Sequence, residues 1–183
     1  MISNQDRSYY IGASDTSYVV GNWNTKSFDN WWLTKLGLYK SDFTNEAMQA
    51  GNNYEHKILD ALEIEGLEKD KQFIKGRLRV NLDGNTENCI YEVKTYNAKK
   101  EFKVSKQYWR QAQAEMWGSG IRKLFIVAYP LEESDYANFF NEIDKSKIQL
   151  IPIEFDSEFC VKEYYPKLDI LSYCLEKGIH PCK

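Results

Sequence analysis

Residues 77–96 constrain the fold more than any other stretch, because they contain two strand-like runs joined by a short polar segment. Residues 77–82 read Arg-Leu-Arg-Val-Asn-Leu, a strict alternation of polar and apolar side chains that is typical of a half-buried strand. Asp83-Gly84 then begins a predicted turn, since Asp-Gly is among the commonest hairpin dipeptides. Residues 89–96 return as a second predicted strand. We therefore expect a sheet that contains this pair of strands.

The remaining segments predict further helices and strands around the pair. Ser14 or Asp15 is expected to cap the first helix. Pro152 indicates an edge strand or a bulge, and Pro166 indicates an interruption of the last helix. Segment 132–146 is ambiguous. Helices are expected at 14–22, 27–37, 44–65, 104–118 and 157–177, and strands at 124–129 and 148–155.

The order of these elements predicts one domain over residues 1–183, of α/β or α+β class, with a central mixed sheet flanked by helices. The net charge of −3 gives no overall basic field, which counts against simple DNA binding. Residues 94–110, however, hold six basic side chains against one acidic side chain. A local basic groove is therefore compatible with the overall charge.

Several classes of protein are disfavoured by what the sequence lacks. The four cysteines form no C-x-x-C pair, so neither a zinc ribbon nor an iron–sulfur cluster is expected. There is no G-x-S-x-G motif to support a Ser-His-Asp hydrolase. The first residues lack the apolar core of a secretory signal, and no apolar run approaches membrane-spanning length. We expect a protein of the reducing cytoplasm without a membrane partner.

Asp83, Glu92 and Lys94 form the pattern that carries chemistry. Glu92 and Lys94 lie two residues apart on a predicted strand and share a face, and hairpin pairing could bring Asp83 beside Glu92. Two carboxylates can hold Mg²⁺ or Mn²⁺, which activates water and neutralises a scissile phosphate. The lysine could position that water or stabilise the transition state. The alternative is a plain Asp-Gly turn followed by solvated strand residues.

Glu55 interrupts an apolar stripe on the predicted helix 44–65. A glutamate in such a stripe is costly to bury unless it is paired or binds a metal. The alternative is a glutamate at the margin of the stripe, paired with a lysine such as Lys57. His56 would point about 100° away from Glu55, which favours a surface role over ligation. The apolar residues at the offsets of one helical face are Met48, Ile58, Leu59 and Leu62.

Five short motifs occur in an order and spacing that, taken together, resemble one family. They are Arg7 followed by Gly12-Ala13-Ser14-Asp15, then Gly51-x-x-Tyr54-Glu55, Asp83-Gly84, Glu92-Val93-Lys94, and Tyr108-x-x-Gln111-x-Gln113-x-x-Met116-Trp117. The chain resembles the lambda-exonuclease-like (YqaJ-type phage recombinase) family of the PD-(D/E)XK nucleases. The resemblance covers about two-thirds of the chain and is weak in the C-terminal region. Leu82 replaces the proline of the family's name.

The resemblance implies roles for the residues that match the motifs. Asp83 and Glu92 would be the main metal ligands, with help from the Val93 carbonyl. Glu55 would act on the metal directly or through water, and Lys94 would be the catalytic lysine.

Three further matched residues would handle the substrate. Gln111 would contact the nucleophilic water or the DNA. Arg7 and Ser14 would bind a 5′-phosphate, a reasonable role for a guanidinium fork and a helix N-terminus.

The resemblance also implies an activity and partners. The protein would be a Mg²⁺-dependent exonuclease that digests linear double-stranded DNA from 5′ to 3′ during phage-type recombination, in the cytoplasm of a bacterial host. Its partners would be DNA ends and a single-strand annealing protein, and it would form a homo-trimer. Two alternatives stay open: an endonuclease of the same superfamily, acting in restriction or repair, and a non-catalytic DNA-binding protein on this fold.

Overall fold

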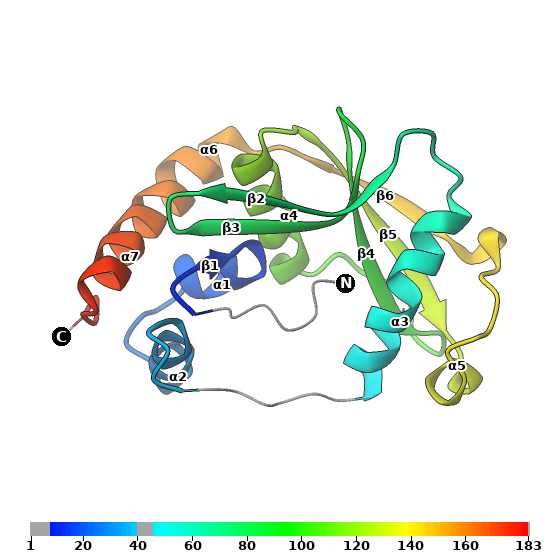
Figure 1. The fold of residues 1–183 in the computed structure, drawn as a ribbon, viewed down its shortest axis with the longest axis horizontal. Coiled ribbons are helices and arrows are strands. Elements are labelled where there is room, and N and C mark those ends of the chain that lie inside the picture. Colours follow the sequence, from blue (N-terminus) through cyan, green and yellow to red (C-terminus); the bar gives the residue numbers. More distant parts are fainter. Residues whose placement is uncertain (1–7, 40–45, 183) are drawn as a thin grey trace.

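The computed structural model describes residues 8–39 and 46–182, and its centre is a six-stranded mixed sheet with helices on both faces (Figure 1). This arrangement confirms the expected fold class. The strands are β1 (Ile11–Gly12), β2 (Glu68–Lys75), β3 (Leu78–Asn85), β4 (Ile90–Asn97), β5 (Lys123–Leu131) and β6 (Gln149–Glu154).

Helices and helical turns surround this sheet. The N-terminal part has a 3-10 turn, Ala13–Asp15, followed by α1 (Thr16–Val19), α2 (Lys26–Lys35) and α3 (Glu46–Ala61). After the central strands come α4 (Lys106–Ser119), α5 (Glu133–Ala137) and a 3-10 turn, Lys145–Lys147. The C-terminal part consists of α6 (Ser157–Phe159), a π-helical turn, Cys160–Tyr164, and α7 (Tyr165–Lys177). None of the helices in the described ranges is long and apolar enough to span a bilayer.

β3 organises the sheet because two different strands share one of its edges. Along the opposite edge it pairs with β2 from end to end. On the shared edge, β1 runs parallel to the start of β3, and β4 runs antiparallel to its end, where only Gly84 pairs with Tyr91 and Asn85 with Ile90. Within the described ranges, residues 80–83 thus have no strand partner on the shared edge. The sheet opens at this point.

The predicted turn at Asp83-Gly84 is wrong, since both residues lie inside β3. The connection to β4 follows at residues 86–89, where the Thr86 amide donates to the Cys89 carbonyl at 2.8 Å. Gly84 serves close packing here instead of a turn. A Cβ on Gly84 would lie 2.9 Å from Leu59 Cδ2, so a larger side chain would push α3 away from the sheet.

β2 was missed because its sequence, Glu-Lys-Asp-Lys-Gln-Phe-Ile-Lys, lacks the alternation of a half-buried strand. Most of its side chains are exposed or only partly buried. Main-chain pairing with β3 holds β2 in the sheet, and the many charged residues of β2 are usual for a strand at a sheet edge. β6, by contrast, lies at the opposite edge, as Pro152 indicated.

The predicted first helix is shorter than 14–22 and is capped differently. Asp15 gives no side-chain cap, since its Oδ2 accepts from the Gly12 amide at 2.8 Å, and Ser14 lies inside the 3-10 turn. The predicted helix 44–65 ends at Ala61, and its expected start at 44–45 lies outside the described residues. The interruption expected near Pro166 is present, as the π-helical turn that precedes α7.

Two hydrophobic clusters pack against the sheet. The larger cluster joins β3 and β5 to α2, α4 and α7. The smaller cluster joins α3 to β4 and β5, and Ala50, Tyr54, Ile58 and Leu59 are its members from α3. Figure 1 shows α3 and α4 at separate places along the sheet, with α7 at the far end from α3. The polar side chains that lie between the two clusters therefore belong to helices and strands that pack in separate clusters.

Gly118 of α4 tests this packing. An added Cβ would overlap the Val80 side chain and lie 3.0 Å from Leu78 Cδ2. Gly→Ala in an exposed helix stabilises by about 1 kcal/mol, but here we expect Gly118→Ala to destabilise by about 1–3 kcal/mol through overpacking. Thermal unfolding should show a Tm lower by about 2–4 °C for each kcal/mol. Gln107→Ala, at an exposed position of α4, is the control. A Gly118→Ala variant as stable as wild type would contradict this account of the α4–β3 contact.

Candidate active site

Asp83 lies where β3 and β4 separate. Its Oδ2 accepts a hydrogen bond from the Val93 amide at 2.9 Å, so a side chain takes the place of a main-chain partner across the opening. This bond ties the Asp83 carboxylate to the middle of β4. The structure therefore brings Asp83 next to the segment that carries Glu92 and Lys94.

Glu92, Lys94 and Gln111 form one hydrogen-bonded group. Lys94 Nζ lies 2.7 Å from Glu92 Oε1 and 3.2 Å from Gln111 Oε1. Gln111 Nε2, from α4, donates to the same Glu92 oxygen at 2.6 Å. The Lys94 ammonium also lies 5.0 Å from the centre of the Tyr108 ring. β4 and α4 thus hold a carboxylate, an ammonium and an amide in fixed mutual positions.

Glu55 joins this group across a pocket of about 260 Å³. Glu55, Asp83, Glu92, Val93 and Lys94 all contribute to its lining. The three acidic residues predicted from separate stretches of sequence therefore face one space.

α3 is held in place beside this pocket by bonds to the segment after α5. The buried Tyr54 hydroxyl donates to the Asn138 carbonyl at 2.7 Å, and burial raises the pKa of Tyr54 to about 12. Lys57 Nζ donates to the Phe139 carbonyl at 2.6 Å. Lys57 is thus occupied by the main chain and does not serve as the partner of Glu55.

A second pocket, of about 270 Å³, lies on the other side of Asp83 and Lys94. The segment from Gly12 to Asp15 forms one wall, where Ser14 lies, and β3 and α4 form the others. Asp83 and Lys94 line both pockets, so the two spaces meet at the most charged part of the site. Arg7, the other residue predicted to bind phosphate, lies outside the described residues.

Four polar residues of the second pocket were missed from the sequence: Lys35, Arg79, Asn81 and Glu115. Lys35 is buried, and its Nζ lies 2.6 Å from Asp15 Oδ2, but in the sequence it reads as an ordinary basic residue at the end of a helix. Arg79 lies two residues before Asn81 in the alternating run of β3, a spacing that could have placed it on the side of the pocket.

Glu115 follows Gln111 by one helical turn, and this spacing was its only signal in the sequence. It is fully buried, and its Oε1 accepts from Gln111 Nε2 at 2.7 Å. The group formed by Glu92, Lys94 and Gln111 therefore extends one turn further along α4.

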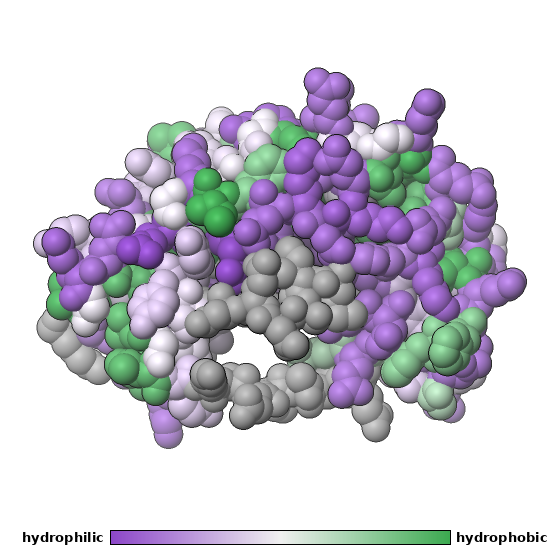
Figure 2. Space-filling model, viewed as in Figure 1, coloured by the Kyte–Doolittle hydropathy of each residue, from purple (hydrophilic) through white to green (hydrophobic). Residues whose placement is uncertain are grey.

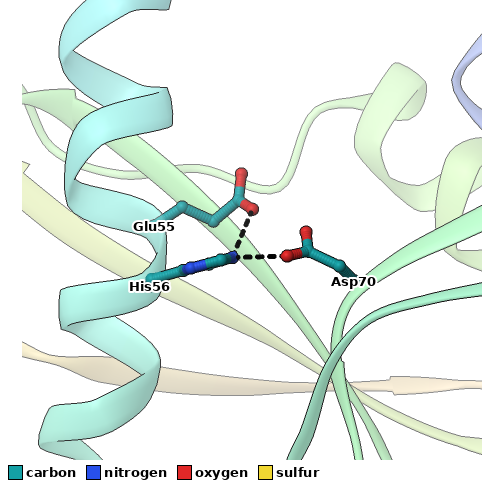
Figure 3. Close-up of side chains that lie close together, drawn as sticks. All are labelled: Glu55, His56 and Asp70. Atoms are coloured by element: carbon teal, nitrogen blue, oxygen red, sulfur yellow. Dashed lines mark ion pairs between the residues drawn. The ribbon is translucent and has the colours of Figure 1, made fainter. Parts of the chain in front are cut away.

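Glu55 and His56 project from α3 towards Asp70 of β2, and the three side chains lie close together (Figure 3). His56 Nε2 lies 2.9 Å from Asp70 Oδ2 and 4.0 Å from Glu55 Oε1. Across the described ranges, this is the one set of three such side chains whose potential ligand atoms all lie within 4.8 Å of one another. Glu55 therefore has possible metal-binding neighbours on two sides.

Burial, and after it the crowding of carboxylates, controls the pKa values of the acids in the site. Burial raises the pKa of Asp83 well above its usual range, and the charges of Glu92 and Glu55 raise it further, against the opposing effect of Lys94. Burial and the Glu92 charge also raise the pKa of Glu55. The same two causes raise the pKa of Glu115. Each of these acids is therefore destabilised in its ionised form by burial and by neighbouring carboxylates.

Lys94 responds in the opposite direction. Burial alone would lower its pKa, but the Glu92 and Asp83 carboxylates outweigh burial and raise the pKa above its usual value. Lys94 is thus an ammonium that donates hydrogen bonds, a state that suits it to stabilise negative charge.

The residues fit a hard divalent cation. Mg²⁺ and Mn²⁺ prefer oxygen ligands, and Asp83, Glu92 and Glu55 supply carboxylates to one pocket. Glu92 Oε2 is buried and has no hydrogen-bond partner among the described residues. A cation would satisfy this oxygen and relieve the repulsion between the three carboxylates.

The surface around α3 is strongly polar. Figure 2 shows hydrophilic residues gathered over α3 and over the neighbouring ends of β2 and β3. Such a surface suits a charged and hydrated ligand better than an apolar one.

Comparison with solved structures places this fold among exonucleases. An alkaline exonuclease from Laribacter hongkongensis (LHK-Exo) is 19% identical, with a TM-score of 0.70 over 94% of this chain and 92% of that one. A phage-related exonuclease from Haemophilus somnus 129PT is 16% identical, with a TM-score of 0.67 over 95% and 96% of the two chains. At these identities the similarity establishes the shared fold. No curated protein is similar enough in sequence to count as a match.

The sheet and its flanking helices form an α/β fold that this chain shares with the two solved exonucleases. Residues 4–122 match the family described as the YqaJ-like viral recombinase domain, about two-thirds of the chain. The chain therefore belongs to the YqaJ-like viral recombinase family, and the resemblance found in its motifs is confirmed.

The raised pKa of Asp83 makes stability depend on pH. A carboxyl group whose pKa is higher in the folded state than in the unfolded state stabilises the folded protein when it is protonated. This contribution is complete below the unfolded pKa, near 3.8, and is lost as pH rises through the folded pKa. Without metal at about pH 8, Asp83→Asn should raise Tm by about 2–4 °C, or about 1 kcal/mol. The gain should shrink as the pH falls towards about 4. Thermal unfolding of both proteins in chelator, across this pH range, measures the effect.

Added metal then distinguishes the two possible ligand sets. Mg²⁺ or Mn²⁺ should raise the Tm of wild type and of His56→Ala, but not of Asp83→Asn, because a ligand that binds only the folded state stabilises it. The opposite pattern, with the shift lost in His56→Ala and kept in Asp83→Asn, would place the cation at Glu55, His56 and Asp70.

Proposed function

We propose that the protein is a divalent-metal-dependent exonuclease that digests linear double-stranded DNA from 5′ to 3′ in phage-type recombination. It would act in the cytoplasm of a bacterial host. The observation that carries this proposal is the group of Asp83, Glu92, Lys94 and Gln111, which faces Glu55 across one pocket and Ser14 across another. Membership of a viral recombinase family and a fold shared with two exonucleases support it.

Asp83, Glu92 and Glu55, with the Val93 carbonyl, would hold Mg²⁺, and Mn²⁺ would substitute. When bound, the cation would supply charge neutralisation at the scissile phosphate and an activated water. Glu92 Oε2 supports this role, because it is buried and no described residue donates a hydrogen bond to it. A bound cation would offset the cost of removing this oxygen from water.

Lys94 would stabilise the negative charge that develops on the phosphate during cleavage. Its raised pKa keeps it an ammonium, and its place beside both pockets lets it reach a phosphate from either side. Gln111, which bonds to both Glu92 and Lys94, would orient the attacking water or the DNA through its amide.

Ser14 would bind the 5′-terminal phosphate in the second pocket, with Arg7 as its partner from the sequence motif. Lys35, which is paired with Asp15, and Arg79 line the same pocket and supply cationic donors there. A terminal phosphate dianion is better recognised by several cationic and hydroxyl donors than an internal phosphate monoanion is. This pocket therefore favours digestion from an end over internal cutting.

A trimeric assembly and a single-strand annealing partner stay predictions from the family resemblance. Sedimentation velocity of the purified protein tests the first, and co-purification with a single-strand annealing protein tests the second.

Lys94→Ala should lower the rate of digestion at least about 100- to 1000-fold, because one preorganised donor to a transition-state charge contributes about that much. Release of nucleotides from a linear duplex in Mg²⁺ measures the rate, and circular dichroism checks the fold. Lys177→Ala, at an exposed position of α7 outside both pockets, is the matched control and should digest normally. Unchanged digestion by Lys94→Ala would reject the mechanism.

Ser14→Ala should weaken the preference for 5′-phosphorylated ends about tenfold, since a hydrogen bond to a charged group is worth about 1.5–3 kcal/mol. Duplexes with 5′-phosphate, 5′-hydroxyl or blocked ends, labelled on one strand, report both the preference and the strand that shortens. Rapid cutting of covalently closed circles would favour the endonuclease alternative. Metal binding without any cleavage would favour a non-catalytic DNA-binding protein.

A further inference from the structure

Glu115 is the buried acid that the proposed chemistry leaves without a role. It lies on the inner face of α4, fully buried, one turn beyond Gln111. One of its oxygens accepts from Gln111 at 2.7 Å, and the other, Oε2, is buried with no hydrogen-bond partner among the described residues. A buried carboxyl group with one unsatisfied oxygen is costly and needs a reason.

The hydrogen bonds of Gln111 supply that reason. Its amide nitrogen has two hydrogens, and they go to Glu92 Oε1 at 2.6 Å and Glu115 Oε1 at 2.7 Å. Its amide oxygen accepts from Lys94 Nζ at 3.2 Å. With both hydrogens and the oxygen engaged, the amide plane is fixed in one orientation, and a flip would set its oxygen against two carboxylate oxygens.

Glu115 differs from the other two partners of Gln111. Glu92 and Lys94 both line the pocket that also contains Glu55 and Asp83, where the proposed function has them meet metal and phosphate. Glu115 does not line that pocket; together with Gln111 it lines the second pocket instead. It is therefore the partner that can keep Gln111 in place while Glu92 and Lys94 engage ligands.

We propose that Glu115 is a positioning residue for Gln111, which holds the Gln111 amide beside Glu92 and Lys94 and so sets the rate of cleavage more than the binding of DNA. This inference rests on the proposed function for its effect on rate. The positioning of the amide is a separate claim that can be measured in the protein alone.

Two substitutions separate the acceptor from the charge. Glu115→Gln keeps an oxygen at the same distance along the side chain and removes the charge, whereas Glu115→Met keeps the length and removes the acceptor. Met116→Leu, a buried neighbour on α4 outside both pockets, is the control for packing. Removing a buried charge in favour of an apolar side chain is often neutral or stabilising, so we expect Glu115→Met to fold with an equal or higher Tm.

For digestion of a 5′-phosphorylated duplex, Glu115→Met should lower kcat about 10- to 100-fold with KM changed less than about twofold, because a reacting group misplaced by about 1 Å costs about that much. Glu115→Gln should stay within about threefold of wild type, and Met116→Leu should match wild type. Wild-type kcat in Glu115→Met would overturn the proposal. An equal loss in both Glu115 variants would also overturn it, since the charge and not the acceptor would then matter.

The second measurement does not depend on digestion. In ¹H–¹⁵N spectra the side-chain NH₂ of Gln111, assigned by its loss in Gln111→Met, should give two protected, shifted signals in wild type and in Glu115→Gln. In Glu115→Met one of the two should move towards the position of a solvent-exposed amide. Solvent-like signals in wild type would overturn the proposal even if Glu115→Met failed to fold. Protected signals in a protein that does not digest DNA would reject the proposed function alone.

Discussion

The sharing of one edge of β3 between β1 and β4 is the constraint on which the site depends. Main-chain pairing with β4 stops after two residue pairs, and the Asp83 side chain accepts the next amide, that of Val93. If β4 continued along β3, Val93 would bond to main chain and Asp83 would lose its tie to β4. The opening makes room for two pockets, and the hydrogen bond across it keeps Asp83 beside the residues of β4 that flank it. The interruption of main-chain pairing between β3 and β4 thus makes room for the pockets and also places Asp83 beside the acidic residue of β4.

The opening between β3 and β4 also brings several carboxylates together where they have little contact with solvent. Burial and the Glu92 charge raise the pKa of both Asp83 and Glu55, the Glu55 charge raises that of Asp83 further, and Lys94 opposes the rise at Asp83. Structural ion pairs are usually arranged to cancel, and this group is not. Its imbalance is the feature that points to a cationic ligand. The hydrogen bonds from Lys94 and Gln111 to one Glu92 oxygen leave the other oxygen of that carboxylate available.

The sequence predicted those parts of the fold and site that depend on local periodicity. Alternation along β4 placed Glu92 and Lys94 on one face, and the apolar stripe of α3 set Glu55 inside it. β2 has no such periodicity, because an exposed edge strand needs only main-chain pairing. The Asp83-Gly84 dipeptide was ambiguous. In the sequence, a glycine required by a turn cannot be told from a glycine in a strand that leaves room for a leucine of α3. The pocket residues Lys35 and Arg79 come from separate elements, and only the tertiary fold brings them together.

The division of the interior into two clusters has a consequence for the order of unfolding. α3 is attached through the smaller cluster and through bonds to the segment after α5, while α4 and β3 belong to the larger cluster. Regions with fewer buried contacts open at lower free energy than the molecule as a whole. Detachment of α3 alone would carry Glu55 away and leave Lys94, Gln111 and Glu115 in place. The first state populated on warming would then be a folded protein in which Glu55 has left the other carboxylates. A cation bound to all of these carboxylates would connect α3 to β3 and β4 and so oppose this opening.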